Sequence, residues 1–389
     1  MSGPLLASGQ ARFRTWLPTR IFGGAGSAGK AARIAADTGI RKAILVSDRG
    51  LEAAARTLAE ALGPLHACTF LDVEPDTGVE IIDRATELAR RHSADGVVSL
   101  GGGSVMDTAK GVAAALKTEG SVRPLIGTGT MKGKTAAPHL GIPTTAGAGS
   151  EVTCAAVIRD GAAKLVFWDD ALYPAAAILD PLLTLKLPAR LTAATGMDAL
   201  THAVEAVHSL SSGPLTDALA LHAVSLISGS LREAVHLPGN PDARMSMLVA
   251  SNLAGQAISN AFLGSVHALA HSVGAHCRVH HGTANAILLP HVMRMNLELN
   301  PEFCAPRYAA VGRALGVPHG SPEELSLRAV QRIGALIREV DLPSRLRDVN
   351  VPPGSGALLA EGAMADISHR TNPVPMTREL FEQLAERAW

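Results

Sequence analysis

Aromatic residues are scarce in this sequence, where they make up 3% of 389 residues. Such a low content argues against the stacked aromatic platforms that bind single-stranded nucleic acid. An excess of charge of one sign is also missing, because Lys plus Arg and Asp plus Glu both total 35. With no basic arm and no acidic tail, the chain lacks the electrostatic features of nucleic-acid or charged-membrane binding. We therefore expect small molecules as its partners, and neither nucleic acid nor membrane.

Cysteine is also rare, and the four cysteines (Cys68, Cys154, Cys277 and Cys304) form no CxxC pair. This scatter is typical of reduced thiols in a cytosolic protein and not of a disulfide framework. No uninterrupted apolar run reaches the roughly 18 residues of a membrane-spanning helix. The first residues also lack the basic segment and apolar stretch of a signal peptide. These absences predict a cytoplasmic protein.

Two kinds of segment are present, and they divide the chain. Residues 42–47, 66–71 and 96–100 have the composition of strands, and helix-like segments lie between them and after the last. This alternation predicts an α/β domain with a parallel sheet covered by helices. From about Leu183 onward, alanine- and leucine-rich segments with helical periodicity dominate. We expect an α/β dinucleotide-binding domain at residues 1–182 and an all-helical metal-binding, catalytic domain at 183–389.

A glycine-rich turn follows the strand predicted at residues 96–100. Gly101, Gly102, Gly103 and Ser104 lead from that strand directly into a helical segment. Glycine lets the backbone approach a phosphate closely, and the free amides of a helix start favour negative charge. The order is not GxGxxG, so the common dinucleotide fingerprint does not apply as written. The alternative is a glycine turn selected only for tight packing.

Asp48 lies just after the strand predicted at residues 42–47. An acidic residue there can accept hydrogen bonds from a ribose and repel a 2′-phosphate, which would favour NAD over NADP. The alternative is that Asp48 only caps the turn into the next helix. The adjacent Arg49 leaves the choice between NAD and NADP open at this point.

Histidine and aspartate recur at helical spacing in the second half. Asp198 and His202 are four residues apart, as are His267 and His271, and His281 follows in a His-Gly step. A spacing of four puts both side chains of a pair on one face of a helix. Imidazoles with a carboxylate are a donor set suited to Fe²⁺ or Zn²⁺. Each histidine taken singly is more often structural, but the two pairs together predict a metal site.

Four stretches agree in order and spacing with one known family. They are GGGSVMDTAKG at 101–111, IPTTAGAGSEVT at 142–153, ATGMDALTHAVEA at 194–206 and VHALAHSVGAHCRVHHGTANAILLPHVMRMN at 266–296. Together they resemble the iron-containing (group III) alcohol dehydrogenases, and the resemblance extends from about Ile21 to the end of the chain.

The resemblance implies a role for each residue of the histidine and aspartate set. The implied metal ligands are Asp198, His202, His267 and His281. His271 would be the histidine that does not bind the metal, lying near the nicotinamide as a candidate proton relay. The implied catalytic residues are therefore His271, Asp198 and His267.

The resemblance also implies a cofactor site. Its residues would be Gly101, Gly102, Gly103, Ser104 and Asp107 around the pyrophosphate, Thr144, Thr145 and Ser150 along the cofactor cleft, and Lys164 and His271 close by. Asp48 falls where the family has the aspartate that disfavours NADP. NAD is therefore the expected cofactor, with Fe²⁺ as the expected metal and Zn²⁺ as the alternative.

The implied activity is hydride transfer between NAD(H) and a small alcohol or aldehyde, by a homo-oligomer such as a dimer. The residue before the His-Gly step is usually proline in the family but is His280 here, and Arg278 lies close to it. If both residues line the pocket mouth, an anionic aldehyde would gain a charge-assisted contact; otherwise Arg278 is a solvated surface residue. The alternatives are a dehydroquinate-synthase-like lyase using NAD and metal, a metal-independent maleylacetate-type reductase, and a non-catalytic binding protein.

Overall fold

The computed structural model describes residues 13–161 and 163–389 of the chain. Most of the segment considered above as a signal peptide, residues 1–12, lies outside the described residues. The described chain divides into two compact units. One comprises Leu17–Lys186, and the other comprises residues 187–389 together with residues 13–16. Each unit is described by itself.

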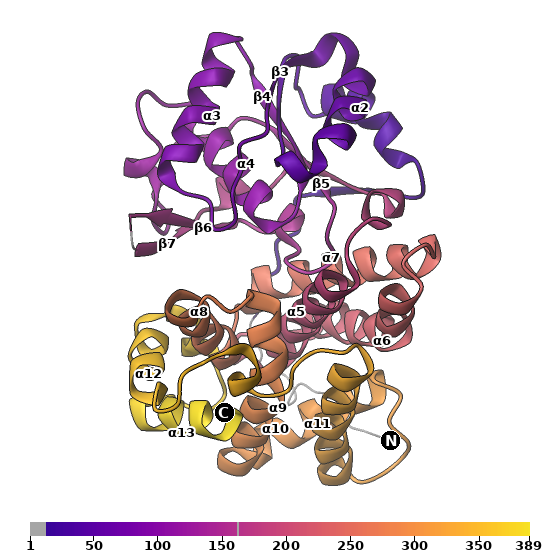
Figure 1. The fold of residues 1–389 in the computed structure, drawn as a ribbon, viewed down its shortest axis with the longest axis vertical. Coiled ribbons are helices and arrows are strands. Elements are labelled where there is room, and N and C mark those ends of the chain that lie inside the picture. Colours follow the sequence, from indigo (N-terminus) through magenta and orange to yellow (C-terminus); the bar gives the residue numbers. More distant parts are fainter. Residues whose placement is uncertain (1–12, 162) are drawn as a thin grey trace. The chain divides into compact units, whose positions relative to one another are not determined.

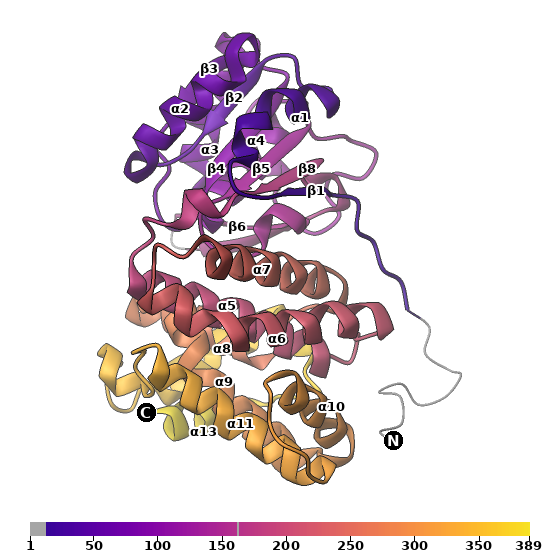
Figure 2. The same ribbon diagram turned by 90° about the vertical axis from the view of Figure 1, so that its right-hand side faces the viewer.

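A six-stranded sheet forms the centre of the first unit. In spatial order its strands are β1 (Arg20–Gly23), β8 (Ala176–Leu179), β5 (His139–Pro143), β4 (Gly96–Gly101), β2 (Ala43–Val46) and β3 (His66–Phe70). Every pairing within this sheet is parallel, which confirms the prediction. Figure 2 shows β4, β5, β8 and β1 in this spatial order across the sheet. The four inner strands are buried at every residue, as expected for a parallel sheet covered on both faces.

Helices cover both faces of this sheet. They are α1 (Ala31–Asp37), α2 (Glu52–Leu62), α3 (Val79–Arg91) and α4 (Gly103–Ala115), seen around the sheet in Figures 1 and 2. Ile44 of β2 packs in one apolar cluster with Ile82 of α3, whereas the next residue, Leu45, packs in another with Leu58 of α2. Successive side chains of a strand point to opposite faces, so one apolar run supplies both cores.

A two-stranded antiparallel hairpin was not predicted. It consists of β6 (Ala155–Asp160) and β7 (Ala163–Trp168), which form a sheet of their own and do not pair with the parallel sheet. Side chains alternate between buried and more exposed positions along β6, which is typical of a sheet with one solvated face.

The second unit is helical, as predicted. Its helices are α5 (Ala189–His208), α6 (Pro214–His236), α7 (Pro241–Ala261), α8 (Ser265–Cys277), α9 (His281–Leu299), α10 (Pro301–Ala314), α11 (Pro322–Glu339), α12 (Gly356–Ala365) and α13 (Arg378–Ala388). Four of these helices begin with proline, which is tolerated there because the first amide has no intrahelical partner. Within the described part of the chain, no helix combines the length and apolar character needed to cross a membrane.

Helix α5 lies at the centre of this unit. It packs against α6, α7 and α9, and Figure 2 shows α5, α6 and α7 running side by side. Its buried residues run almost without a break from Thr192 to His208 and include Asp198, His202 and Glu205. Buried ionisable groups must be paired or bind a metal, because leaving a charge unpaired in the interior is very costly. Helix α5 therefore locates the candidate site.

Candidate active site

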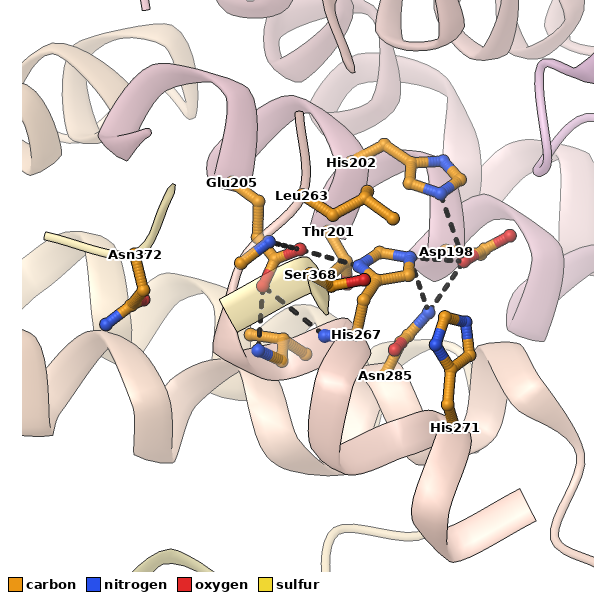
Figure 3. A network of polar contacts seen from close by, with 12 residues as sticks. Asp198, Thr201, His202, Glu205, Leu263, His267, His271, Asn285, Ser368 and Asn372 are labelled. Carbon is orange, nitrogen blue, oxygen red and sulfur yellow. Dashed lines mark hydrogen bonds and ion pairs between the residues drawn. The ribbon is translucent and has the colours of Figure 1, made fainter. Parts of the chain in front are cut away.

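Three helices bring the predicted metal ligands together. Asp198 and His202 lie one turn apart on α5, His267 lies in the first turn of α8, and His281 is the first residue of α9. The Oδ1 atom of Asp198 is 3.4 Å from Nε2 of His281, 3.6 Å from Nε2 of His267 and 3.8 Å from Nε2 of His202. Figure 3 shows the side chains of Asp198, His202 and His267 turned toward one another.

The close packing of α9 against α5 explains why a glycine, Gly282, directly follows His281. A β-carbon at this position would lie 2.2 Å from the carbonyl oxygen of Ala194 and 3.4 Å from Cβ of Asp198. Real atoms do not approach so closely, so only glycine lets the start of α9 pack against α5 at this depth. Glycine at this step therefore allows His281 to reach Asp198.

The donor atoms fit a divalent cation. One ligand atom each from Asp198, His267 and His281 lies within 4.8 Å of the others, and the ring of His202 stacks on His267 with centroids 4.6 Å apart. The amide nitrogen of Asn285 lies among these acceptors, 2.7 Å from Oδ1 of Asp198 and 3.2 and 3.1 Å from the two Nε2 atoms. The electropositive NH₂ group of Asn285 thus lies where Asp198, His267 and His281 converge, and a carboxylate with imidazoles is the ligand set that Fe²⁺ and Zn²⁺ prefer.

The electrostatics keep Asp198 and His202 in the protonation states that metal binding requires. Burial alone would raise the pKa of Asp198, but the charges of His202 and His281 hold that pKa well below its usual value. Burial lowers the pKa of His202 to about 4. At neutral pH Asp198 is therefore an anion and His202 a neutral imidazole with a free lone pair, as ligands must be.

Glu205 is a component of the site that the sequence analysis missed. It is fully buried on α5, and its Oε2 accepts a 2.6 Å hydrogen bond from Nδ1 of His267. Burial opposes a charge on His267, but Glu205 and Asp198 together raise its pKa to about 9. Its position three residues after His202, on the same face of α5, was the available signal.

His271 lies beside the ligand set. Its ring stacks on that of His281 with centroids 5.1 Å apart, and its Nδ1 is 2.6 Å from Oδ2 of Asp366. Asp366 also accepts a hydrogen bond from the backbone of Ser368. Burial opposes the charge on Asp366, but the hydrogen bond from His271 and that residue's charge hold its pKa far below the usual value. Asp366 was not predicted, because it lies 95 residues away in the sequence.

The predicted phosphate turn joins β4 to α4 in the first unit. Gly101 ends β4, Gly102 precedes α4, and Gly103 and Ser104 begin it. A β-carbon on Gly101 would lie 2.5 Å from the side chain of Val105, so the turn is also packed tightly. The packing interpretation therefore holds for Gly101. The turn also opens a helix whose first amides favour an anion, and phosphate binding there stays a prediction.

The segment predicted to line the cofactor cleft folds against this turn. The amide of Thr144 donates to the carbonyl oxygen of Gly101 at 3.1 Å, and the side chain of Thr145 lies next to Gly102. Ser150 begins a short 3-10 helix, and its hydroxyl donates to Asp107 at 3.1 Å. Asp107 also accepts from the backbone of β6 at Val157, so its contacts here hold the fold together.

Lys110 is a second group that the sequence analysis missed. Its ammonium is fully buried and donates to the hydroxyls of Ser150 and Thr153 and to the carbonyl oxygen of Ala155. Burial lowers the pKa of Lys110 to about 8, although the charge of Asp107 opposes this shift. Lys110 therefore fastens α4 to the segment leading into the hairpin.

Asp48 and Lys164 are the remaining predicted cofactor residues. Asp48 follows β2 at the same end of the sheet as the glycine turn, since β2 and β4 are parallel neighbours. Its Oδ1 accepts from the amide of Gly50 at 2.9 Å, so it does act as a cap. Lys164 lies on β7 and forms a 2.8 Å ion pair with Asp76. A role of either residue in cofactor binding stays a prediction.

Comparison with known proteins gives consistent matches over nearly the whole chain. The family model for iron-containing alcohol dehydrogenase matches residues 18–181, and the C-terminal model of the Fe-containing alcohol dehydrogenase family matches residues 192–389. The chain is 40% identical over 346 residues to the 1,3-propanediol dehydrogenase of Citrobacter freundii, covering 86% of this chain and 88% of the relative.

Solved structures agree with these sequence matches. A crystal structure of a 1,3-propanediol oxidoreductase superposes with a TM-score of 0.92 at 36% identity, covering 97% of this chain and 100% of the other. The sulfoacetaldehyde reductase of Bifidobacterium kashiwanohense, solved with NAD⁺, superposes with a TM-score of 0.87 at 29% identity, covering 97% and 99%.

Proposed function

Because the chain belongs to the iron-containing alcohol dehydrogenase family, we propose that the ligand set on α5, α8 and α9 binds the divalent metal used in its reaction. The chain is an NAD-linked oxidoreductase of alcohols and aldehydes. The observation that carries the proposal is the convergence of Oδ1 of Asp198 with the Nε2 atoms of His267 and His281. His202 completes the set as the fourth ligand.

The chemistry that NAD(H) and a divalent cation would supply follows from the general properties of these two groups. Bound NAD(H) gives or takes the hydride, and a bound divalent cation acts as a Lewis acid toward the substrate oxygen. The protein's part is to hold the donor atoms in place. Asp198 would supply the negative charge, and His202, His267 and His281 would supply nitrogen donors, with His267 giving up its Nε2 proton when the metal binds. We propose Fe²⁺ as the metal, with Zn²⁺ as a functional substitute.

His271 and Asp366 form the proton-handling pair in this proposal. The hydrogen bond from Nδ1 of His271 to Asp366 orients the ring and leaves Nε2 to take or give the proton of the alcohol. Burial lowers the pKa of His271 from its ordinary value, which favours a neutral ring whose Nε2 can accept a proton. The stacking of His271 on His281 places it directly beside the ligand set.

The cofactor is proposed to bind at the carboxyl ends of β2 and β4. The first amides of α4, after Gly101 and Gly102, would hold the pyrophosphate, and Asp48 would accept hydrogen bonds from the ribose of NAD. Asp107 and Ser150 support this site through their mutual hydrogen bond. NADP is disfavoured, because a 2′-phosphate would face the carboxylate of Asp48.

The decisive test of the activity is a panel of alcohols and aldehydes assayed with NADH and NADPH after reconstitution with Fe²⁺ or Zn²⁺. We expect net NADH oxidation with small aldehydes and loss of turnover on chelation. A metal-independent maleylacetate-type reductase would be insensitive to the chelator. A dehydroquinate-synthase-like lyase would consume no NADH with any aldehyde.

An anionic aldehyde is the second candidate substrate. His280 directly precedes the proposed ligand His281, and Arg278 follows the last residue of α8 as an exposed residue in the left-handed conformation. The similarity to a sulfoacetaldehyde reductase favours this candidate. We expect Arg278→Ala to lower kcat/KM for an anionic aldehyde and to leave a neutral aldehyde of the same length unchanged. Equal rates on the two aldehydes in the wild type would exclude the idea.

The proposal also covers assembly and location. We propose a homodimer that acts in the cytoplasm, where the four free cysteines would remain thiols. Light scattering on the purified protein measures the assembly directly: a monomeric mass would contradict the dimer.

A further inference from the structure

Glu205 makes an unusually complete set of hydrogen bonds at the start of α8. Its Oε2 accepts from the amide of Gly264 at 2.8 Å and from Nδ1 of His267 at 2.6 Å. Its Oε1 accepts from the amide of Val266 at 2.7 Å and from that of His267 at 3.4 Å. Figure 3 shows Glu205 on the side of His267 away from Asp198. One carboxylate thus contacts both the backbone and the side chain of a proposed ligand.

The backbone contacts make Glu205 a cap supplied by another helix. Gly264, Val266 and His267 lie at the first positions of α8, where amides have no partner within their own helix. A carboxylate there also interacts favourably with the positive end of the helix dipole. Gly264 is required for the contact, because a β-carbon would lie 2.8 Å from Oε1 of Glu205. Glu205 therefore fixes where α8 begins relative to α5.

The side-chain contact determines which nitrogen of His267 carries a proton. An ionised carboxylate can only accept, so the 2.6 Å contact requires a proton on Nδ1. The other nitrogen, Nε2, faces Oδ1 of Asp198 at 3.6 Å and is the atom aimed at the metal. Carboxylates hydrogen-bonded to the far nitrogen of a histidine ligand fix its tautomer and orientation.

We propose that Glu205 is a positioning residue of the metal site: it caps α8 and holds His267 with Nε2 presented to the metal. This inference rests on the proposed function of the site. Glutamine has the same shape but offers one acceptor and one donor. In one orientation its NH₂ group would face the Gly264 amide and the Nδ1 proton of His267, and in the other the amides of Val266 and His267, so two hydrogen bonds of the set are lost in either case.

The test is the affinity for Zn²⁺, measured by competition with a chromophoric chelator on the full chain. We expect Glu205→Gln to bind Zn²⁺ about 10- to 100-fold more weakly than the wild type. Glu298→Gln is the matched control, since Glu298 is exposed on α9 and pairs with Arg387. This control should bind Zn²⁺ as the wild type does.

The outcomes separate this inference from the proposal on which it rests. A wild type that binds no Zn²⁺ overturns the metal site itself. Tight binding by the wild type and equal binding by Glu205→Gln overturns only the role of Glu205. If that variant fails to fold, nitrogen NMR of the zinc-loaded wild type decides. We expect a proton on Nδ1 of His267, and a proton on Nε2 with metal at Nδ1 would contradict the inference.

Discussion

At the scale of single residues, the site depends on close approaches as much as on donor atoms. Asp198 is the common neighbour of the three histidines, but His281 reaches it only because Gly282 lets α9 contact the backbone of α5. Glu205 and Gly264 show the same relation at the start of α8. Gly282 and Gly264 are therefore as much a part of the proposed metal site as the side chains that they allow to approach.

Gly282→Ala tests this dependence. The added methyl group would push α9 away from the carbonyl of Ala194, so we expect weaker metal binding and a loss of about 1–3 kcal/mol of stability. Gly229→Ala on α6 is the control, because a β-carbon there meets open space. That change should raise stability by up to about 1 kcal/mol. Urea unfolding and metal analysis measure both effects, and a Gly282→Ala protein with wild-type metal affinity would contradict the packing argument.

A matched pair of histidines on α8 separates binding from proton transfer. His267→Ala is expected to abolish metal retention and turnover, whereas His271→Ala should retain the metal and lose about 100-fold or more in kcat. Elemental analysis and steady-state kinetics of the two variants provide the comparison. Full metal occupancy in His267→Ala would remove that residue from the ligand set.

Asp217 lies away from the site, and its raised pKa predicts that the stability of the protein depends on pH. Burial raises its pKa to about 6, although Arg307 opposes the shift. The folded-state pKa lies above the unfolded value of about 3.9. The stabilisation that the protonated carboxyl of Asp217 contributes is therefore fully present below about pH 3.9 and is lost as pH rises through about 6. We expect Asp217→Asn to be more stable than the wild type above that pH, by about 2 kcal/mol or less. Urea unfolding at several pH values checks this, and an unchanged difference across the range would contradict it.

At the scale of helices and strands, much of the architecture could be predicted from apolar runs and helical periodicity. The buried runs at residues 42–47 and 96–100 became β2 and β4, because inner strands of a parallel sheet are apolar on both faces. The hairpin of β6 and β7 was missed, because its strands are only partly buried and include charged residues beside their apolar ones. Glu205 and Asp366 were missed because their partners are distant in sequence.

Asp48, just after β2, provides a test of the choice between NAD and NADP. Asp48→Gly removes the carboxylate proposed to repel a 2′-phosphate, so we expect relaxed discrimination between NADH and NADPH. The lost cap to Gly50 should cost only about a few tenths of a kcal/mol of stability, which leaves the fold intact. The ratio of kcat/KM for the two cofactors measures the effect. An unchanged ratio would leave Asp48 with only its capping role.

At the scale of the whole molecule, the residues proposed to bind NAD and those proposed to bind the metal lie in different parts of the chain. The residues proposed for NAD lie in the unit of residues 17–186, and the proposed metal ligands lie in that of residues 187–389. Loss of the metal should therefore leave NAD binding largely intact, as calorimetry of His267→Ala with NAD⁺ would show. The assignment of residues 1–182 and 183–389 to two domains stays a prediction that limited proteolysis can test.

The most direct measurement of the central claim is anomalous X-ray scattering from crystals of the metal-loaded protein. The account predicts one strong peak within bonding distance of Oδ1 of Asp198 and a ring nitrogen of each of His202, His267 and His281. An ion bound elsewhere, with these four side chains left to hydrogen-bond one another, would contradict it.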